Sequence, residues 1–178
     1  MVENSANGLS ALFNNTTGNN NTATGVAALA TNTEGFDNSA TGFEALLDNT
    51  TGHWNTAIGS GALVVNTTGI GNTAVGHIAL NHNTTGGGNI AFAAAGNAVT
   101  TAIGVIAVGH GGGNVSNSCF IGNIRDVATH NNDAIPVVID SYGQLGTASS
   151  SRRFKKEIKP MDKASEAILA LKPVHVSL

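Results

Sequence analysis

Charged and aromatic side chains are scarce in this chain of 178 residues. Asp, Glu, Lys and Arg make up 11% of it, against about 25% in ordinary globular domains, and aromatic residues make up 4%. So few large side chains favour thin, regular packing over a thick core. Residues 1–150 contain one basic residue, Arg125, beside eight acidic ones. This lack of Lys and Arg argues against nucleic-acid binding, which requires neutralisation of the phosphates.

The chain also lacks cysteine pairs, long apolar runs and metal-ligand clusters. Its single cysteine, Cys119, excludes an intrachain disulfide, and we expect it to be buried as a small apolar residue. No stretch reaches the roughly 18 apolar residues of a membrane-spanning helix. The N-terminal MVENSANG has no signal-peptide core. The six histidines have no paired cysteine or nearby carboxylate, so we expect neither a metal site nor a cofactor.

What the chain has instead is an internal repeat of 17 residues. NTAIGSGALVVNTTGIG at 55–71 is followed by NTAVGHIALNHNTTGGG, and six copies begin at residues 4, 21, 38, 55, 72 and 89. We count places from the first residue of each copy. Asn holds place 1 and Ala place 3 in all six copies, while Gly at place 5, Ala-Leu at 8–9, Asn-Thr at 12–13 and Gly at 15 recur in five. The repeat residues include Asn21, Asn38, Asn55, Asn72, Asn89, Gly25, Gly42, Gly59, Gly76, Leu29, Leu46, Leu63 and Leu80.

A constant period without insertions predicts identical units stacked on one another. Seventeen residues are too few for two helices with turns, and Gly, Asn and Thr are poor helix formers. We therefore expect an all-β solenoid whose coil contains two short strands and two turns. Glycines should occupy turns with positive φ, stacked Asn should form amide ladders between coils, and Ala and Leu should fill a narrow interior.

Places 4 and 6 carry apolar residues that the interior of one coil cannot hold. Over the six copies place 4 reads Asn, Thr, Thr, Ile, Val, Phe, and place 6 reads Leu, Val, Phe, Ser, His, Ala. A single rod would expose these side chains, whereas rods packed side by side would bury them. A closed homotrimer satisfies this requirement, although the exposed places alone do not fix the number of chains.

The xTAxGxxAL and NTTG copies resemble the head repeats of trimeric autotransporter adhesins over roughly residues 4–110. The resemblance implies a left-handed parallel β-roll, with three chains packed into one head. It also implies an extracellular location, on a bacterial surface at the outer membrane or on a virion fibre. The ligand, whether host surface, matrix or glycan, is not identified. Repeat units in that family are shorter than 17 residues, which leaves the coil shape open.

Pattern and charge divide the chain into three segments, 1–97, 98–148 and 149–178. The first holds the β-roll repeats, and the second reads as irregular β structure in which AIPVVIDSYGQLG at 134–146 predicts strand, turn and short strand. The third is a basic tail with seven basic and three acidic residues. Asp162 as N-cap, an apolar face from Ala164 to Leu171, and Pro173 predict a short C-terminal α-helix there.

The tail SSSRRFKKEIKPMDKASEAILALKPV at 149–174 resembles the start of the intramolecular chaperone domain of endosialidases and phage tail spikes. In that family the domain trimerises, assists folding of the β-rich trimer before it, and then cuts itself off just before a serine. The resemblance therefore implies cleavage between Ser149 and Ser150, with Ser150 as nucleophile and Lys155 as base. The matching residues are Ser150, Arg153, Phe154, Lys155, Ile158 and LKPV at 171–174.

The tail departs from that family in three ways. Ser151 stands where the family has Asp, Glu157 stands where it often has Asn, and the chain stops at Leu178 while the family's domain continues. Lys155 lies among basic neighbours and needs desolvation before it can act as a base. We therefore expect a chain that carries the cleavage motif and does not cleave.

The sequence thus predicts a structural, adhesive surface protein: a trimeric head or fibre-like rod followed by the beginning of a trimerisation chaperone. Two alternatives stay open. One is a serine autopeptidase, which would yield a fragment ending at Ser149 that Ser150→Ala abolishes. The other is an ice- or glycan-binding β-solenoid, suggested by the Thr rows, although place 2 mixes Ser, Thr and Ile.

Overall fold

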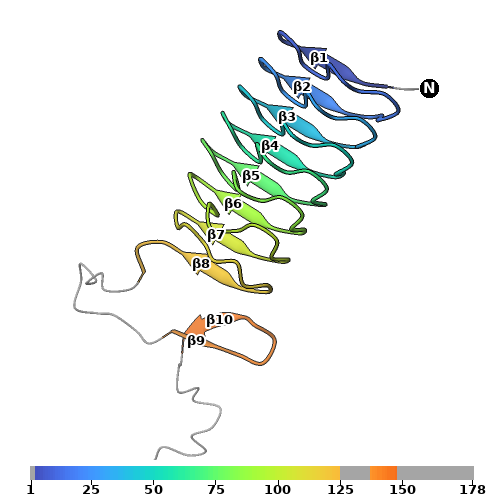
Figure 1. Cartoon of the computed structure of the whole chain (residues 1–178). Coiled ribbons are helices and arrows are strands. Elements are labelled where there is room, and N and C mark those ends of the chain that lie inside the picture. The colour runs from blue at the N-terminus through green and yellow to red at the C-terminus, as the bar shows by residue number, and fades with distance from the viewer. Residues whose placement is uncertain (1–2, 125–136, 148–178) are drawn as a thin grey trace, which may run out of the picture. The chain divides into compact units, whose positions relative to one another are not determined.

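The computed structural model describes residues 3–124 and 137–147 of the chain. The chain divides into two compact units, Met1–Val127 and Ala128–Leu178. The first unit contains a parallel β-solenoid and the second contains a β-hairpin (Figure 1). The described residues contain no helix, and the helix expected after Asp162 lies outside them.

Eight three-residue strands follow one another along the solenoid, one in each coil, and form a single parallel sheet in chain order (Figure 1). In β2 and β3 the middle residue is buried while its neighbours are exposed, as the two-residue period of a strand requires. Place 3 therefore faces the interior, and places 2 and 4 face outward. The strands are β1 (Ser5–Asn7), β2 (Thr22–Thr24), β3 (Ser39–Thr41), β4 (Thr56–Ile58), β5 (Thr73–Val75), β6 (Ile90–Phe92), β7 (Ile106–Val108) and β8 (Cys119–Ile121).

The register of the sheet follows the repeat of the sequence. Ala40 pairs with Ala57, and Ala57 with Ala74, so each coil advances by 17 residues. The prediction of stacked units with this period is confirmed. The sheet extends beyond residue 97, because β7 and β8 continue it with shorter coils: Ile90 pairs with Ile106, and Ile106 with Cys119.

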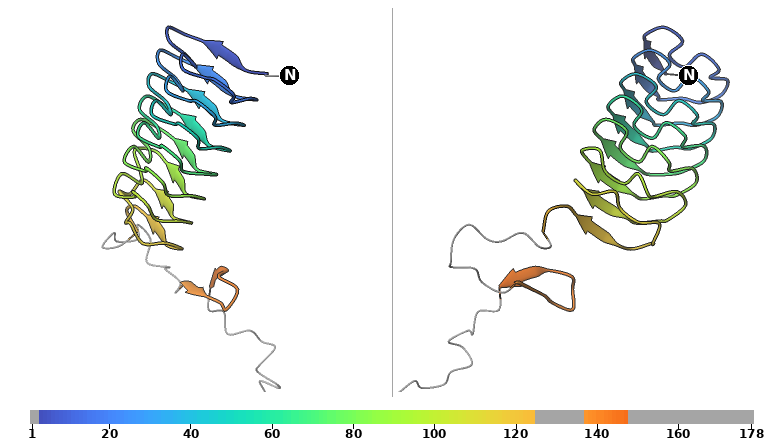
Figure 2. Two further views of the ribbon diagram at one scale, coloured as in Figure 1. Left: turned by 45° about the vertical axis from the view of Figure 1, so that its right-hand side comes forward. Right: turned by 60° about the vertical axis from the view of Figure 1, so that its left-hand side comes forward.

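The expected second strand of each coil is not formed. After place 5 of each coil, alternate residues have backbone angles in the left-handed region: Ala27 at place 7 has φ 57° and Leu29 at place 9 has φ 51°. Left-handed residues cannot continue an extended strand. Their backbone groups nevertheless bond between coils, with Leu29 N–H donating to Ala45 O and Thr31 N–H to Leu47 O, both at 3.0 Å. The coils therefore stay bonded on both sides and nest closely (Figure 2).

The glycines of the repeat serve two different purposes. At place 5, Gly25 and Gly42 have φ of 135° and 138°, so the expected positive φ is confirmed there. At place 15 the expectation is wrong, because Gly35 does not adopt positive φ. Gly35 is required by close approach instead: a Cβ there would collide with Asn32 Oδ1 and with the carbonyl oxygen of Gly52 in the next coil.

Small and medium apolar residues fill the narrow interior, as predicted. Ala57 at place 3 and Ala62 and Leu63 at places 8 and 9 are fully buried, and the same places are fully buried in the neighbouring coils. Burial of a leucine side chain contributes about 1.5–3 kcal/mol, so Leu29, Leu46, Leu63 and Leu80 give the four coils that hold them a similar share of stability.

The second unit contains the hairpin of β9 (Val137–Ile139) and β10 (Leu145–Thr147), which pair antiparallel. Asp140 Oδ1 accepts the backbone N–H groups of Tyr142 and Gln144, each at 2.9 Å, and so holds the turn. The predicted strand, turn and short strand at 134–146 are confirmed within the described residues.

Candidate functional site

The predicted catalytic pair, Ser150 and Lys155, lies outside the described residues, as does the whole segment 149–178. The candidate functional surface is therefore sought on the solenoid. Its repeat residues come first, because the sequence singles them out most clearly.

The asparagines of place 1 form a buried ladder along the solenoid. In one rung, the Asn55 backbone N–H and Nδ2 donate to Asn38 Oδ1 at 3.0 and 3.1 Å, and Nδ2 also donates to the carbonyl oxygen of Gly69 at 2.8 Å. Asn55 Oδ1 in turn accepts the backbone N–H and Nδ2 of Asn72 at 3.0 and 3.1 Å. The predicted amide ladder is confirmed, with its members Asn21, Asn38, Asn55, Asn72 and Asn89 buried.

A second ladder, at place 12, joins the first through the glycine of place 15. Asn66 Nδ2 donates to Asn49 Oδ1 at 2.9 Å and to the Gly69 carbonyl oxygen at 3.2 Å, the same oxygen that accepts Asn55. Beside this ladder Thr67 Oγ1 donates to the carbonyl oxygen of Thr84 at 3.1 Å. The repeated Asn and Gly residues therefore satisfy one another inside the solenoid, and their role is structural.

The outward surface offers little acid, base or metal chemistry. The parts of the chain that the structure describes contain no Lys or Arg and no group of three His, Cys, Asp or Glu able to hold a metal. Cys119 is exposed, so the expectation of a buried thiol is wrong. The reason is its position: it opens β8 at the outward-facing place 2, which the decaying repeat hides in the sequence.

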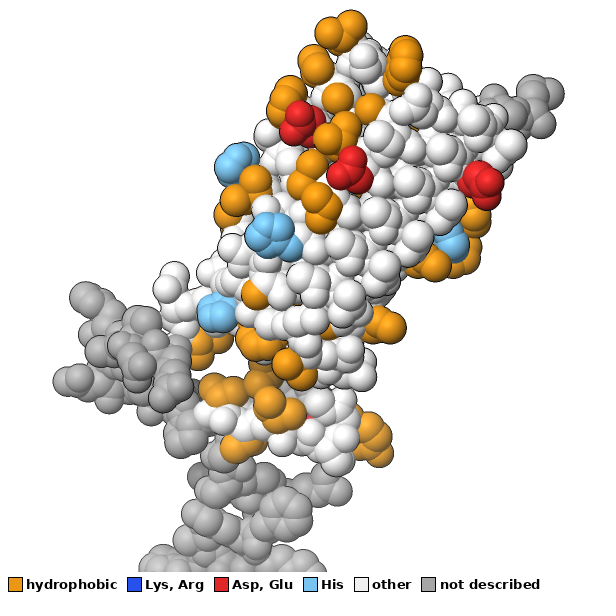
Figure 3. Space-filling view, in the orientation of Figure 1, with side chains coloured by type: hydrophobic (Ala, Val, Ile, Leu, Met, Phe, Trp, Pro, Cys, Tyr) orange, Lys and Arg blue, Asp and Glu red, His pale blue; other side chains and the backbone are white. Residues whose placement is uncertain are grey.

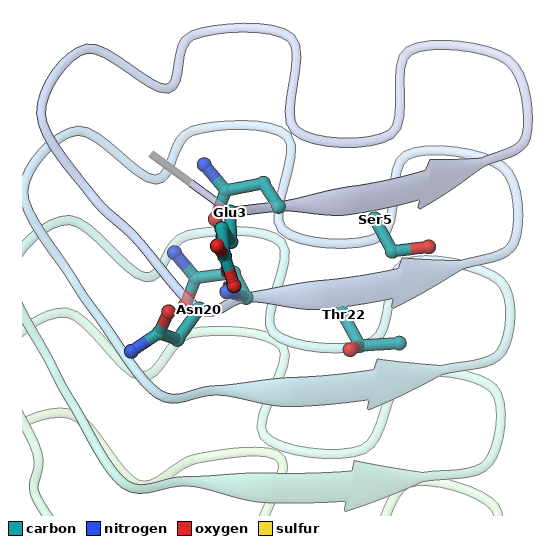
Figure 4. Close-up of a pocket in the computed structure, with 6 residues that line it drawn as sticks. Glu3, Ser5, Asn20 and Thr22 are labelled. Carbon is teal, nitrogen blue, oxygen red and sulfur yellow. Dashed lines mark hydrogen bonds between the residues drawn. The ribbon is translucent and has the colours of Figure 1, made fainter. Parts of the chain in front are cut away.

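A hollow lies over the first two coils, beside β1 and β2. It is lined by Glu3, Asn4, Ser5, Asn20, Asn21 and Thr22. Glu3 and Asn20 stand near the start of the two strands, and Ser5 and Thr22 project from the strands themselves (Figure 4). Side chains of places 17 and 2 thus flank a shallow recess above the buried Asn of place 1. Glu3 is its one titratable residue, so it has no acid–base pair.

The most extensive outward feature is a row of apolar side chains, one in each of the eight coils. In the first three coils it occupies place 6 and in the next five place 4, on either side of the glycine of place 5. Exposed fractions include 75% for Leu9, 52% for Phe43, 46% for Ile58 and 44% for Ile121. Figure 3 shows apolar side chains gathered near both ends of the solenoid. We call this row the apolar stripe: Leu9, Val26, Phe43, Ile58, Val75, Phe92, Val108 and Ile121.

A smaller aromatic cluster lies elsewhere, at places 16 and 17. Phe36 and His53 are stacked with centroids 4.4 Å apart, and Trp54 stands nearly perpendicular to both, at 6.0 and 4.7 Å. Trp54 Nε1 donates to Asp37 Oδ2 at 3.3 Å. Sequence analysis missed this cluster. The signal that could have found it is the chain's single Trp and a Phe standing one repeat apart in adjacent places.

In comparisons with protein-family models, with curated proteins and with solved structures, nothing matched this chain. Within residues 3–124 and 137–147 no helix is long and apolar enough to cross a membrane. Function is therefore inferred from the surface of the solenoid.

Proposed function

We propose that this chain is the rod-like head of a homotrimeric surface adhesin or fibre, displayed outside a bacterial cell or on a virion. The apolar stripe is the observation that supports this function. It supplies one apolar residue per coil along the solenoid, exposed in seven coils and half-buried at Val75 in the fifth, and large exposed apolar surfaces mark sites of association. A stripe parallel to the stacking direction matches the same stripe on an identical chain aligned in the same direction.

The number of chains and the hand of the coil come from the resemblance to trimeric autotransporter heads. A closed three-fold arrangement brings three copies of one stripe together and leaves no apolar edge for further growth. We propose a left-handed roll on the same ground. Residues 149–178 would then be the beginning of the trimerisation chaperone that follows the head, with Ser150 and Lys155 as the remnant of its cleavage site.

Two substitutions test the stripe without altering the coil. Phe43→Ser introduces the residue that Ser60 supplies at the same place 6, and Ile58→Thr introduces the residue that Thr41 supplies at place 4. We expect sedimentation equilibrium to give three times the 17.9 kDa chain mass for the parent protein. The double variant should dissociate at about tenfold higher concentration or more, because buried aromatic and aliphatic anchors dominate interfaces.

Thr68→Ala is the matched control, since Thr68 is exposed at place 14, away from the stripe. A double variant that dissociates no more readily than this control contradicts the stripe as the interface. Circular dichroism on all three proteins ensures that the comparison is between folded solenoids.

A further inference from the structure

Trp54 occupies a position at which the fold favours other residues. Place 17 is left-handed in successive coils, with φ of 54° at Asp37, 59° at Trp54, 67° at Gly71 and 63° at Gly88. A bulky side chain strains such a backbone, whereas Gly, Asn and Asp tolerate it. Trp54 is also 59% exposed. Neither backbone preference nor burial favours a tryptophan here, which singles Trp54 out as a candidate for a binding role.

The cluster holds the indole ring in a fixed orientation. Phe36 and His53 are parallel within 11°, while Trp54 lies at 86° and 79° to them and closer to His53. Trp54 therefore lies along the side of the stacked pair. Its Nε1 is anchored on Asp37, and its backbone N–H donates to the carbonyl oxygen of Phe36 at 3.2 Å. With 59% of Trp54 exposed, much of this oriented indole is available to a ligand.

A threonine and a glycine follow Trp54 on the outer surface of the next coil. Thr56, two residues after Trp54, opens β4 at the outward-facing place 2, as Thr22 opens β2 beside the hollow of Figure 4. In the next coil Gly71 replaces the large side chain, and a Cβ there would meet no heavy atom closer than 4.0 Å. We call the outer surface formed by Asp37, Trp54, Thr56 and Gly71 the shelf.

We propose that this shelf binds a neutral saccharide. The partly positive C–H face of a sugar ring stacks on the negative π face of Trp54. Asp37 and Thr56 then accept and donate hydrogen bonds to the sugar hydroxyls. Asp37 has no Lys or Arg near it in the described solenoid, so the site repels anionic sugars. The inference rests on the proposed surface function, for which it names the ligand class.

The cluster is too local to be a rod-to-rod contact. Places 16 and 17 hold Asn19 and Asn20 in the first coil, and Gly87 and Gly88 in the fifth. The aromatic surface therefore ends within a few coils, whereas the apolar stripe runs through all eight. A stable protein interface needs a larger continuous area.

The test is a glycan array probed with the full chain and two glycine variants. Trp54→Gly removes the indole and installs the residue that Gly71 already uses, so the fold is retained. Asn117→Gly is the matched control, because Asn117 is exposed with a similar left-handed φ, 56°, in a distant coil. We expect the parent and Asn117→Gly to retain a common set of neutral glycans, and Trp54→Gly to bind them about tenfold more weakly or worse.

The fluorescence of the single tryptophan reports this site alone. Titration with a neutral oligosaccharide found on the array should give a saturable change in emission, weakened several-fold by Thr56→Val. The proposal is overturned if no neutral glycan distinguishes the parent from Trp54→Gly. It is also overturned if the emission responds only to heparin, an anionic glycan, or only to choline chloride, which supplies a quaternary ammonium cation. A trimeric mass without glycan binding would refute this inference alone, and glycan binding by a monomer would refute only the trimeric rod.

Discussion

Replacing Asn55 with Ala removes a central rung of the place 1 ladder. The side chain makes four hydrogen bonds: Nδ2 donates to Asn38 Oδ1 and to the Gly69 carbonyl oxygen, and Oδ1 accepts the Asn72 backbone N–H and Nδ2. Asn55 is 1% exposed, so water cannot replace these partners without opening the coil.

The expected destabilisation follows from this set of bonds. Each hydrogen bond contributes about 1 kcal/mol net, and a buried donor left without a partner costs about 1–3 kcal/mol. The Asn72 backbone N–H becomes such a donor, so the free energy of unfolding should fall by about 4–6 kcal/mol. Asn49→Ala, in the second ladder, removes three bonds and leaves no backbone N–H without its partner. It should be less destabilising, at about 3 kcal/mol.

Urea unfolding, followed by circular dichroism and by the emission of Trp54, measures these differences. Protein concentration is held constant, because association contributes to apparent stability. Asn81→Ala is the control: Asn81 Oδ1 is buried with no hydrogen-bond partner. Asn81→Ala should lower the free energy of unfolding by less than about 0.5 kcal/mol, or raise it.

The account of the ladders requires the loss in the free energy of unfolding to be largest for Asn55→Ala, smaller for Asn49→Ala and smallest for Asn81→Ala. Equal losses for Asn55→Ala and Asn81→Ala would refute the account of the ladders as the polar support of the coils. Hydrogen exchange gives an independent check, since the Asn72 amide should exchange faster in Asn55→Ala and not in Asn81→Ala.

Four further predictions concern other parts of the chain. Gly35→Ala should lower the free energy of unfolding by about 1–3 kcal/mol or more, through collision with the ladder. Leu63→Ala should lower it by about 2–5 kcal/mol; urea unfolding measures both, and near-neutral values would contradict the packing. Cys119 should react fully with Ellman's reagent in the native protein, and reaction only after denaturation would contradict its exposure. The chain should keep its 17.9 kDa intact mass on incubation; a fragment ending at Ser149, abolished by Ser150→Ala, would instead establish an active autopeptidase.

The repeat alone was enough to predict the stacking, the interior and the ladders. The recurrence of Ala57 at place 3 in all six copies and of Leu63 at place 9 in five identifies two inward positions, because residues that stack in register must share one environment. The same logic identifies Asn55, since a polar residue repeated at one place can bond to its own copies. These predictions needed no knowledge of the dihedral angles within a coil.

The path of the backbone within each coil could not be predicted in the same way. Leu29 and Ala27 adopt left-handed φ values that their side chains disfavour, and bonds between coils override that preference. Gly35 was assigned to a turn, but its lack of a Cβ matters for close approach to the next coil. The conformational preferences of single residues contain no information on how closely one coil approaches the next.

Exposure of apolar residues at places 4 and 6 was predicted, but their arrangement in one row and the aromatic cluster were not. Alignment of the copies emphasises what is common, whereas the apolar stripe changes from place 6 at Phe43 to place 4 at Ile58. Trp54 occurs once and therefore contributes nothing to a periodic pattern. Ligand-binding residues of a repeat protein are expected among such exceptions, because binding needs one site and stacking needs every coil.

The mass of the chain in solution tests the central claim most directly. Light scattering on the purified protein should give three times 17.9 kDa, together with β-type circular dichroism. A folded β-rich protein with the mass of a single chain would contradict the trimeric head and leave the apolar stripe without its proposed partner.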